Sequence, residues 1–195
     1  MSRLNALLLA VRRLHEATPE LSAYTPWPTD LVQVPVAPVS CEASTTIGMQ
    51  RMRGTRATSP VTRALRAAAA DLEWRQTYTE AEVGSRFLQT YGYVELFGPG
   101  GHFRSRQSRG YIAYWGPDLT YDWHAHEAEE LYFGLAGQAV FTAPGSSNVV
   151  LRPGEARAHA SNQPHFMMTL GFPFLAYVLW RGKGLEGLPS MVAGR

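Results

Sequence analysis

Residues 121–132, with the sequence YDWHAHEAEELY, bring two histidines, a glutamate and two tyrosines into one short segment. His124 and His126 are two residues apart, so in a β-strand both imidazoles leave the same face. Glu130 shares this parity. Imidazole nitrogens and a carboxylate oxygen are a ligand set for Zn, Fe, Mn, Ni or Co rather than for a soft thiolate site. The segment therefore predicts a partly open metal site.

A structural role is the ordinary explanation for a single histidine, and we expect it for His15 and His102. His124, His126 and Glu130 differ, because three ligand-type side chains on one strand face would be costly to bury without partners. The step from residue 127 to residue 129 is compatible with one continuous strand or with a turn between two strands. Either arrangement brings the three side chains to one interior point.

The spacing of these residues resembles the first motif of the cupin barrels, Gly–x–HxH–x–Glu–x–Gly. The corresponding residues are Gly116, His124, His126, Glu130 and Gly137. Pro153-Gly154 followed by residues 162–165 resembles the second cupin motif, whose histidine is the remaining protein ligand. The resemblance implies one divalent metal ion per chain, of unresolved identity, with the ligands His124, His126, Glu130 and His165. His159 comes six residues earlier, where we expect the chain still to be turning, so His165 is the stronger candidate.

The chain also resembles one branch of the cupins, the dimethylsulfoniopropionate lyases of the DddQ type. This resemblance rests on the pattern Tyr121–His124–His126–Glu130–Tyr132 and covers roughly residues 90–182. It continues through residues 95–100, 115–117, 165–169 and 179–182. Two positions depart from the pattern: Asp122 stands where the family has proline, and Met168 stands where it has a basic residue.

This resemblance implies a metal-dependent carbon–sulfur lyase that cleaves dimethylsulfoniopropionate to dimethyl sulfide and acrylate by β-elimination. Removing the proton alpha to a carboxylate requires a base and positive charge near that carboxylate. Tyr132 is the predicted base, because a nearby metal ion lowers the pKa of a phenol. Tyr121 is the predicted positioning group or alternative base. Trp180 and Tyr121 are predicted to bind the sulfonium through their rings, whereas Trp123, of opposite parity to the histidines, is expected in the core.

Three other functions are compatible with the same motif. The chain could be a lyase-like cupin acting on another small carboxylate. It could be a metal-dependent cupin oxygenase or isomerase, since a fold does not fix a function. A non-catalytic cupin that binds a small molecule is the third alternative, although such a module gains little from two tyrosines beside a metal.

The first 90 residues are expected to form a helical extension packed on the barrel. Leu4, Leu7, Leu8, Val11 and Leu14 recur at helical spacing. Ser59-Pro60 predicts a helix start with serine as the cap, and the helix is expected to run to Arg75. Thr79 and Glu82 predict a capping box for a helix to about Leu88. Residues 41–58 are expected to form a surface loop.

From Tyr93 onward the apolar pattern becomes that of short strands separated by turns. The predicted strands are residues 93–97, 111–115, 120–126, 130–135, 138–142, 148–151, 165–170 and 174–180. Many short strands with regular turns favour an antiparallel sandwich or barrel. The predicted fold class is therefore mainly β: a cupin-type antiparallel barrel (double-stranded β-helix) at residues 91–195, preceded by the helical extension at 1–90.

The composition limits which partners and which cellular location we expect for the protein. The 195 residues carry a formal charge of +2, and Lys183 is the single lysine among 18 basic residues, so nucleic acid is not an expected partner. Cys41 is the single cysteine, which suits a reducing cytosol. Arg12 and Arg13 interrupt the apolar N-terminal run, which argues against a signal peptide. We expect a cytoplasmic bacterial enzyme with a small carboxylate substrate, no membrane partner, and a homodimer as a compatible assembly.

Overall fold

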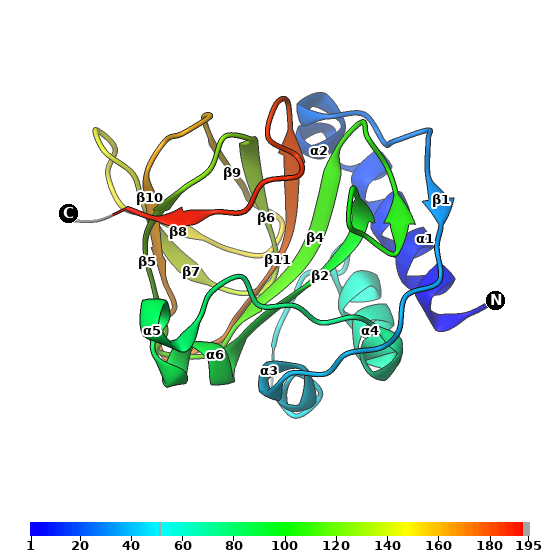
Figure 1. The fold of residues 1–195 in the computed structure, drawn as a ribbon, viewed down its shortest axis with the longest axis horizontal. Coiled ribbons are helices and arrows are strands. Elements are labelled where there is room, and N and C mark those ends of the chain that lie inside the picture. Colours follow the sequence, from blue (N-terminus) through cyan, green and yellow to red (C-terminus); the bar gives the residue numbers. More distant parts are fainter. Residues whose placement is uncertain (51, 193–195) are drawn as a thin grey trace.

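Two β-sheets face each other in the computed structural model, which describes residues 1–50 and 52–192 (Figure 1). The larger, seven-stranded sheet has the strand order β1-β3-β2-β4-β11-β6-β9, and the five-stranded sheet has the order β12-β5-β10-β7-β8. The strands of the larger sheet are β1 (Val32–Gln33), β2 (Tyr91–Gly98), β3 (Phe103–Arg104), β4 (Arg109–Trp115), β6 (Glu129–Gly137), β9 (Ala156–His159) and β11 (Phe174–Arg181). Those of the smaller sheet are β5 (Thr120–Ala125), β7 (Ala139–Thr142), β8 (Val149–Leu151), β10 (His165–Met168) and β12 (Ser190–Met191).

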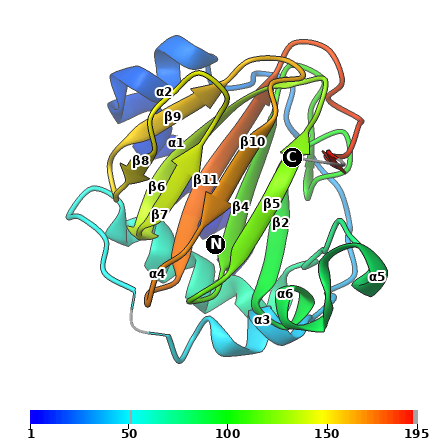
Figure 2. The same cartoon turned by 90° about the vertical axis from the view of Figure 1, so that its left-hand side faces the viewer.

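Helices precede the barrel in the sequence, and the first four cover the outer face of the larger sheet, whereas the last two lie at one end of the barrel (Figures 1 and 2). They are α1 (Arg3–Ala17), α2 (Pro19–Tyr24), α3 (Glu42–Thr46), α4 (Ser59–Ala68), the 3₁₀ turn η1 (Ala69–Asp71), α5 (Glu80–Val83) and α6 (Ser85–Thr90). The described helices include none that is long and apolar enough to cross a membrane. The predicted mainly β cupin-type barrel with N-terminal helices is confirmed.

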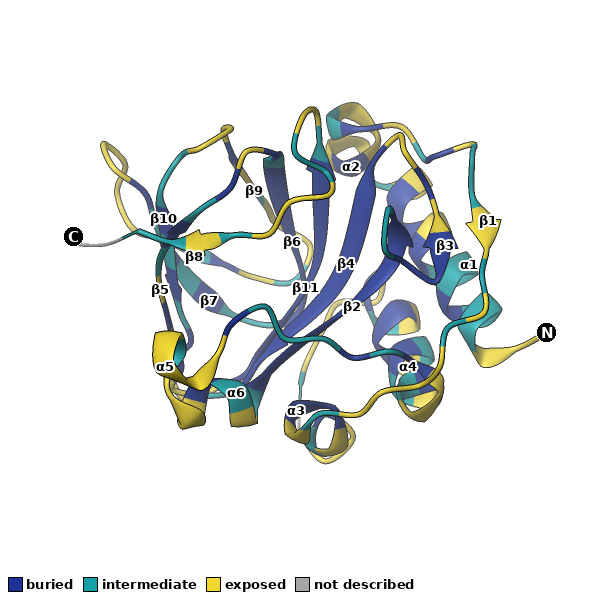
Figure 3. Cartoon of the chain, in the orientation of Figure 1, coloured by how far each residue is buried: buried dark blue, intermediate teal, exposed yellow. Residues whose placement is uncertain are grey.

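The central strands of the larger sheet are buried on both faces, which Figure 3 shows as dark ribbons. In β11, Leu175, Tyr177 and Leu179 pack into the core under the helices. Val178 and Trp180 pack into the second core, between the two sheets. Successive side chains of a strand point to opposite faces, so each central strand contributes alternate residues to two separate cores.

The helix predicted from Ser59 to Arg75 is shorter than expected. Thr58, not Ser59, is the N-cap residue, and α4 ends at Ala68. After η1 the chain becomes extended, and Arg75 exchanges backbone hydrogen bonds with Tyr93. Burial of the extended segment against the sheet overrides the helical preference of the alanine-rich sequence.

Residues 41–58 form the predicted surface loop only in part, since the described residues from 48 to 57 are exposed or half-buried and lie outside helices and strands. The beginning of the segment differs from the prediction: it contains α3, whose residues Ala43 and Ser44 are buried, and Ile47 is 1% exposed. Residue 51 lies outside the described residues. The predicted capping box is confirmed, since the Thr79 amide donates to Glu82 Oε2 at 2.7 Å. The helix it begins does not continue to Leu88, because Gly84 adopts a φ of +79° and separates α5 from α6.

The eight predicted strands are present, with ends shifted by a few residues. The third strand ends at Ala125 and the seventh at Met168, and Leu170, which was predicted to end the seventh strand, is exposed. Strand β9 was not predicted, because its residues, ARAH, carry little apolar alternation. It pairs with β6 at the edge of the larger sheet, and this pairing places His159 inside the barrel.

Candidate metal centre and pocket

The turn after β5 moves the chain from one sheet to the other. Strand β5 ends at Ala125 and belongs to the smaller sheet, whereas β6 begins at Glu129 in the larger sheet. Of the two arrangements compatible with residues 127–129, one continuous strand or a turn between two strands, the turn is therefore the correct one. It places His126 and Glu130 at facing strand ends, and His165 enters from β10, where it is the partner of His124.

Three of the four predicted metal ligands converge on one point. His126 Nε2 lies 3.0 Å and His165 Nε2 lies 3.1 Å from Glu130 Oε2. The three ligand atoms are all within 4.8 Å of one another, and all three residues are buried. This group could hold a metal ion. His124 lies outside the group but beside it, with its ring centroid 4.0 Å from that of His165.

The orientation of the imidazoles fits metal binding. His124, His126 and His165 each use Nδ1 in a hydrogen bond to a backbone carbonyl, which can only accept. The acceptors are the carbonyl oxygens of Asp122, Ala128 and Gln163, at 2.8, 2.8 and 2.9 Å. Each Nδ1 therefore carries a proton, so Nε2 is the nitrogen of each ring that is left to bind a metal ion, as in metal-binding histidines. The Nε2 atom of His124 is buried with no hydrogen-bond partner in the described chain.

The carboxyl and the imidazoles of the group influence each other's pKa. Burial opposes ionisation of Glu130, but the imidazoles of His126 and then His165 outweigh it and hold the pKa of this carboxyl well below its usual range. Burial would also lower the pKa of His126, yet the Glu130 carboxylate raises it. For His124, burial and then the neighbouring His165 lower the pKa well below 6.5. The centre thus combines an ionised carboxylate with at least one neutral imidazole.

A β-bulge places Tyr121 beside the histidines. Strand β5 has one more residue between Tyr121 and His124 than β10 has between their partners, Met167 and His165. Both side chains therefore point inward, and their rings stack at 3.7 Å and 14°. Regular alternation would have sent Tyr121 to the opposite face, so the bulge re-aims it. The expectation that Trp123 lies in the core is wrong: it is half-buried, with its ring 5.8 Å from that of Phe166.

An aromatic pocket adjoins the centre. Glu130 and Tyr132 line it together with Tyr121 and Trp180. Its other lining residues include Tyr91, Tyr93, Tyr111, Trp115, Val178 and Leu188. The aromatic residues among these were not predicted as site residues, although the two-residue spacing in 91–93 and the four-residue spacing in 111–115 put each pair on one strand face.

The predicted catalytic and substrate-binding residues all reach this pocket. Tyr132 has its ring centroid 6.1 Å from that of His165. The hydroxyl of Tyr121 is hydrogen-bonded to that of Tyr78 at 2.7 Å. Trp180 donates from Nε1 to Glu130 Oε1 at 2.8 Å. The structure therefore gathers the predicted site residues in one place, while their roles stay predictions.

The expectation that His159 lies in a turning segment is wrong. It lies in β9, directly opposite Glu130. Its ring stacks on that of His165 at 4.1 Å and 15°, and neither ring nitrogen has a hydrogen-bond partner in the described residues. Burial, and then His165, lower the pKa of His159 to about 3.

His15 and His102, for which a structural role was expected, both have hydrogen-bond partners. His15 is hydrogen-bonded through both nitrogens within the helical core, and His102 Nε2 accepts from the Glu73 amide at 3.2 Å.

Comparison with known proteins identifies the family. The model of the dimethylsulfoniopropionate lyase family matches residues 33–176. This chain belongs to that family. It is 36% identical over 185 residues to the dimethylsulfoniopropionate lyase DddQ of Ruegeria pomeroyi, covering 95% of this chain and 92% of that protein.

Solved structures of the family superpose on almost the whole chain. A chain from the crystal structures of the lyases RdDddP and RnDddQII matches with a TM-score of 0.95 and 42% identity, covering 97% of both chains. The crystal structure of DddQ from Ruegeria pomeroyi DSS-3 matches with a TM-score of 0.93 and 34% identity, covering 99% of this chain and 98% of that one. The helices as well as the barrel are therefore shared with these proteins.

Proposed function

We propose that this family member is a metal-dependent lyase that cleaves dimethylsulfoniopropionate to dimethyl sulfide and acrylate. The observation that carries the proposal is the buried group of His126, Glu130 and His165 beside an aromatic pocket. A zwitterionic substrate needs positive charge for its carboxylate and aromatic faces for its sulfonium. An ion held by the ligand group would supply the positive charge, and the pocket that Glu130 lines supplies the aromatic faces.

The ligand group is proposed to hold one divalent ion. His126, Glu130 and His165 would be ligands, and the unpartnered Nε2 of His124 would be the fourth. The bound ion would supply positive charge that stabilises the enediolate character developing at the substrate carboxylate. Nitrogen and oxygen ligands do not select among Zn, Fe, Mn, Ni and Co by affinity alone.

Tyr132 is the proposed base. Its oxygen would take the proton alpha to the carboxylate, the released electron pair would form the carbon–carbon double bond, and the β carbon–sulfur bond would break with its electrons leaving on sulfur. Burial, and then the Glu130 carboxylate, raise the pKa of Tyr132 well above 10. The phenolate is therefore available only where positive charge in the site compensates this effect.

Tyr121 is proposed to orient the substrate. Its ring lies flat against His124 and its hydroxyl is fixed by Tyr78, so it has little freedom to move. Aromatic faces attract a sulfonium by about 0.5–2 kcal/mol each. Tyr121 and Trp180 are the rings for which this role was predicted, and both line the pocket.

The test is incubation of purified, metal-analysed protein with dimethylsulfoniopropionate while dimethyl sulfide is measured in the headspace. Release of dimethyl sulfide with an equal amount of acrylate, without oxygen uptake, is the expected result. Oxygen consumption would instead favour the oxygenase alternative. A metal-loaded protein that releases no dimethyl sulfide would point to another small carboxylate. The cytoplasmic location and the homodimer stay predictions.

A further inference from the structure

Three side chains on adjacent strands form a row across the larger sheet. Trp180 of β11 is the register partner of Arg109 of β4 on one side and of Glu130 of β6 on the other. We call Arg109, Trp180 and Glu130 the cross-sheet row. All three are buried, with 5%, 2% and 4% of their surface exposed. Directly opposed side chains on neighbouring strands are in contact range, so the row links the metal-ligand group to the centre of the sheet.

Trp180 contacts two residues of the ligand group. Its indole N–H donates to Glu130 Oε1 at 2.8 Å, while the other oxygen, Oε2, faces His126 and His165. The two carboxylate oxygens therefore have separate partners. The indole ring also stacks on the His126 imidazole, with centroids 4.3 Å apart and an angle of 27°. Trp180 thus restrains the carboxylate through a hydrogen bond and the imidazole through a ring contact.

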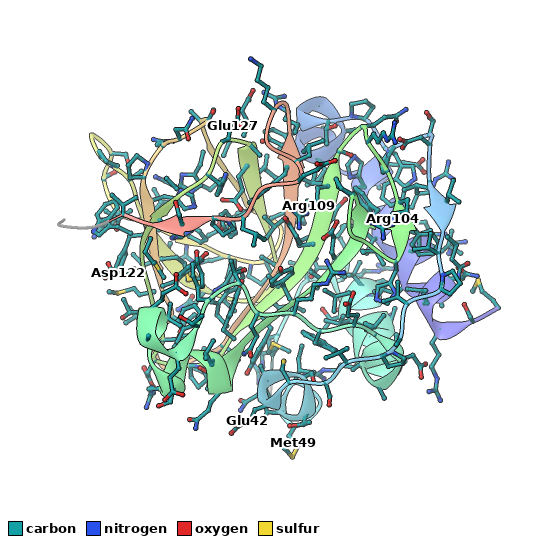
Figure 4. All side chains as sticks on the ribbon, in the orientation of Figure 1. Glu42, Met49, Arg104, Arg109, Asp122 and Glu127 are labelled. Atoms are coloured by element: carbon teal, nitrogen blue, oxygen red, sulfur yellow. The ribbon has the colours of Figure 1, made fainter. Side chains whose placement is uncertain are left out.

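Arg109 holds the other end of the row in place. Its guanidinium carbon lies 5.3 Å from the Trp180 ring centroid. The guanidinium donates to Glu95 Oε2 and to the carbonyls of Leu185 and Gly187, each at 2.8 Å. Figure 4 shows Arg109 in the middle of the molecule, whereas Asp122 lies at its edge. Because a cation already lies over the Trp180 ring, a sulfonium on this ring would lie near a like charge, so of the two rings proposed for the sulfonium Tyr121 is the better placed.

We infer that Trp180 is a positioning residue for the metal ligands. Its N–H fixes Glu130 with Oε2 directed at the histidine nitrogens, and its ring fixes the plane of His126. This inference rests on the proposed metal centre and assigns Trp180 a role that does not depend on the substrate. Residues of this kind, which orient the metal ligands without binding the metal themselves, contribute 10- to 100-fold to metal affinity.

The test removes the donor and keeps the ring. Trp180→Phe retains an aromatic side chain but has no N–H for Glu130. Metal-free wild type and variant are titrated with Zn²⁺ against a chelating dye, and the absorption spectrum of each protein loaded with Co²⁺ is recorded. We expect Zn²⁺ affinity to fall by about 10- to 100-fold and the Co²⁺ spectrum to change, with no substrate present in either measurement.

Trp115→Phe is the matched control. Trp115 lines the same pocket and is equally buried, at 2% exposure, but its Nε1 atom has no hydrogen-bond partner in the described chain. We expect this variant to keep wild-type Zn²⁺ affinity and the wild-type Co²⁺ spectrum. The comparison separates loss of the Glu130 hydrogen bond from loss of an indole in the pocket.

A second replacement guards against misfolding. Benzothienylalanine introduced at position 180 keeps the bicyclic shape and replaces the N–H by sulfur, so the same loss of affinity is expected. Wild-type affinity in both position-180 variants, with an unchanged Co²⁺ spectrum, would overturn the inference. Failure of the wild type itself to bind metal would overturn the proposed centre instead, so the two failures are distinguishable.

Discussion

The two faces of the larger sheet are built from the same strands but from different chemistry. In β4, Ile112 and Tyr114 pack under the helices, whereas Tyr111 and Trp115 face the pocket. The outer core is rich in leucine and other aliphatic side chains, and the inner one is rich in aromatic rings and contains the ligand group. Alternate residues of one strand thus serve packing on one face and binding on the other, so a substitution on one face can alter one property without the other.

The buried histidines show the same division. His15, in the outer core, bonds Thr25 O at 2.8 Å and Tyr177 Oη at 3.1 Å. In the inner core, the ring nitrogens of His159 and the Nε2 of His124 have no partners among the described residues. Buried polar atoms without partners cost free energy. The inner face is therefore suited to bind a ligand, and the outer face to stabilise the fold.

The largest effect is expected from a pair of tyrosines on opposite faces of this sheet. Tyr132→Phe should lower turnover by about 10²–10⁴-fold, the usual loss for a general base, with little change in unfolding free energy. Tyr177→Phe, its matched control, removes the hydroxyl that contacts His15. It should cost about 1 kcal/mol of stability and leave turnover unchanged. Dimethyl sulfide release and urea unfolding measure the two quantities.

Equal turnover in the wild type and Tyr132→Phe would remove Tyr132 as the base and leave Tyr121 as the candidate. Loss of turnover in Tyr177→Phe, with metal content intact, would instead show that the two faces are not independent. Metal content must be measured in both variants, because Tyr132 follows Glu130 by two residues.

The next effect concerns packing under the helices. Leu65 of α4 is fully buried in the outer core. Leu65→Ala should lower the unfolding free energy by about 2–5 kcal/mol, from lost burial and the cavity left behind. Zn²⁺ stoichiometry of the folded variant should stay that of the wild type. A loss of metal binding in fully folded Leu65→Ala protein, at low temperature, would contradict the separation of the two cores.

The fold was more predictable from the sequence than the details of the site. The short apolar runs in 93–97 and 174–180 predicted central strands, because burial on both faces of a strand leaves a local pattern. The inward position of Tyr121 was not predictable from parity, because it depends on a bulge that forms only when β5 pairs with β10. The same holds for His159, which β9 places opposite Glu130 through a long-range pairing.

A smaller effect is expected from the titration of His15. The pKa of this imidazole is lowered, mainly by burial, although Thr25 O and Glu16 oppose the shift. The unfolded chain therefore binds this proton more readily, so His15 stabilises the fold above pH 6.5 and loses that contribution as pH falls. The slope is at most about 1.4 kcal/mol per pH unit. Between pH 7.5 and 5, His15→Gln should lose less stability than wild type in urea unfolding; identical losses would exclude His15 as a source of acid sensitivity.

The smallest effects come from two helix caps. Ser2 Oγ accepts from the Asn5 amide at the start of α1, on the helical side of the molecule. Ser2→Ala should cost about 1 kcal/mol and leave dimethyl sulfide release unchanged, since the buried apolar residues of α1 pack in the outer core. Thr79 caps α5 and follows Tyr78, which holds the Tyr121 hydroxyl. Thr79→Ala should therefore also raise the KM for dimethylsulfoniopropionate, because a looser Tyr78 leaves Tyr121 less firmly placed. Equal kinetics in the two cap variants would show that the Tyr78–Tyr121 contact does not transmit changes from the helices to the pocket.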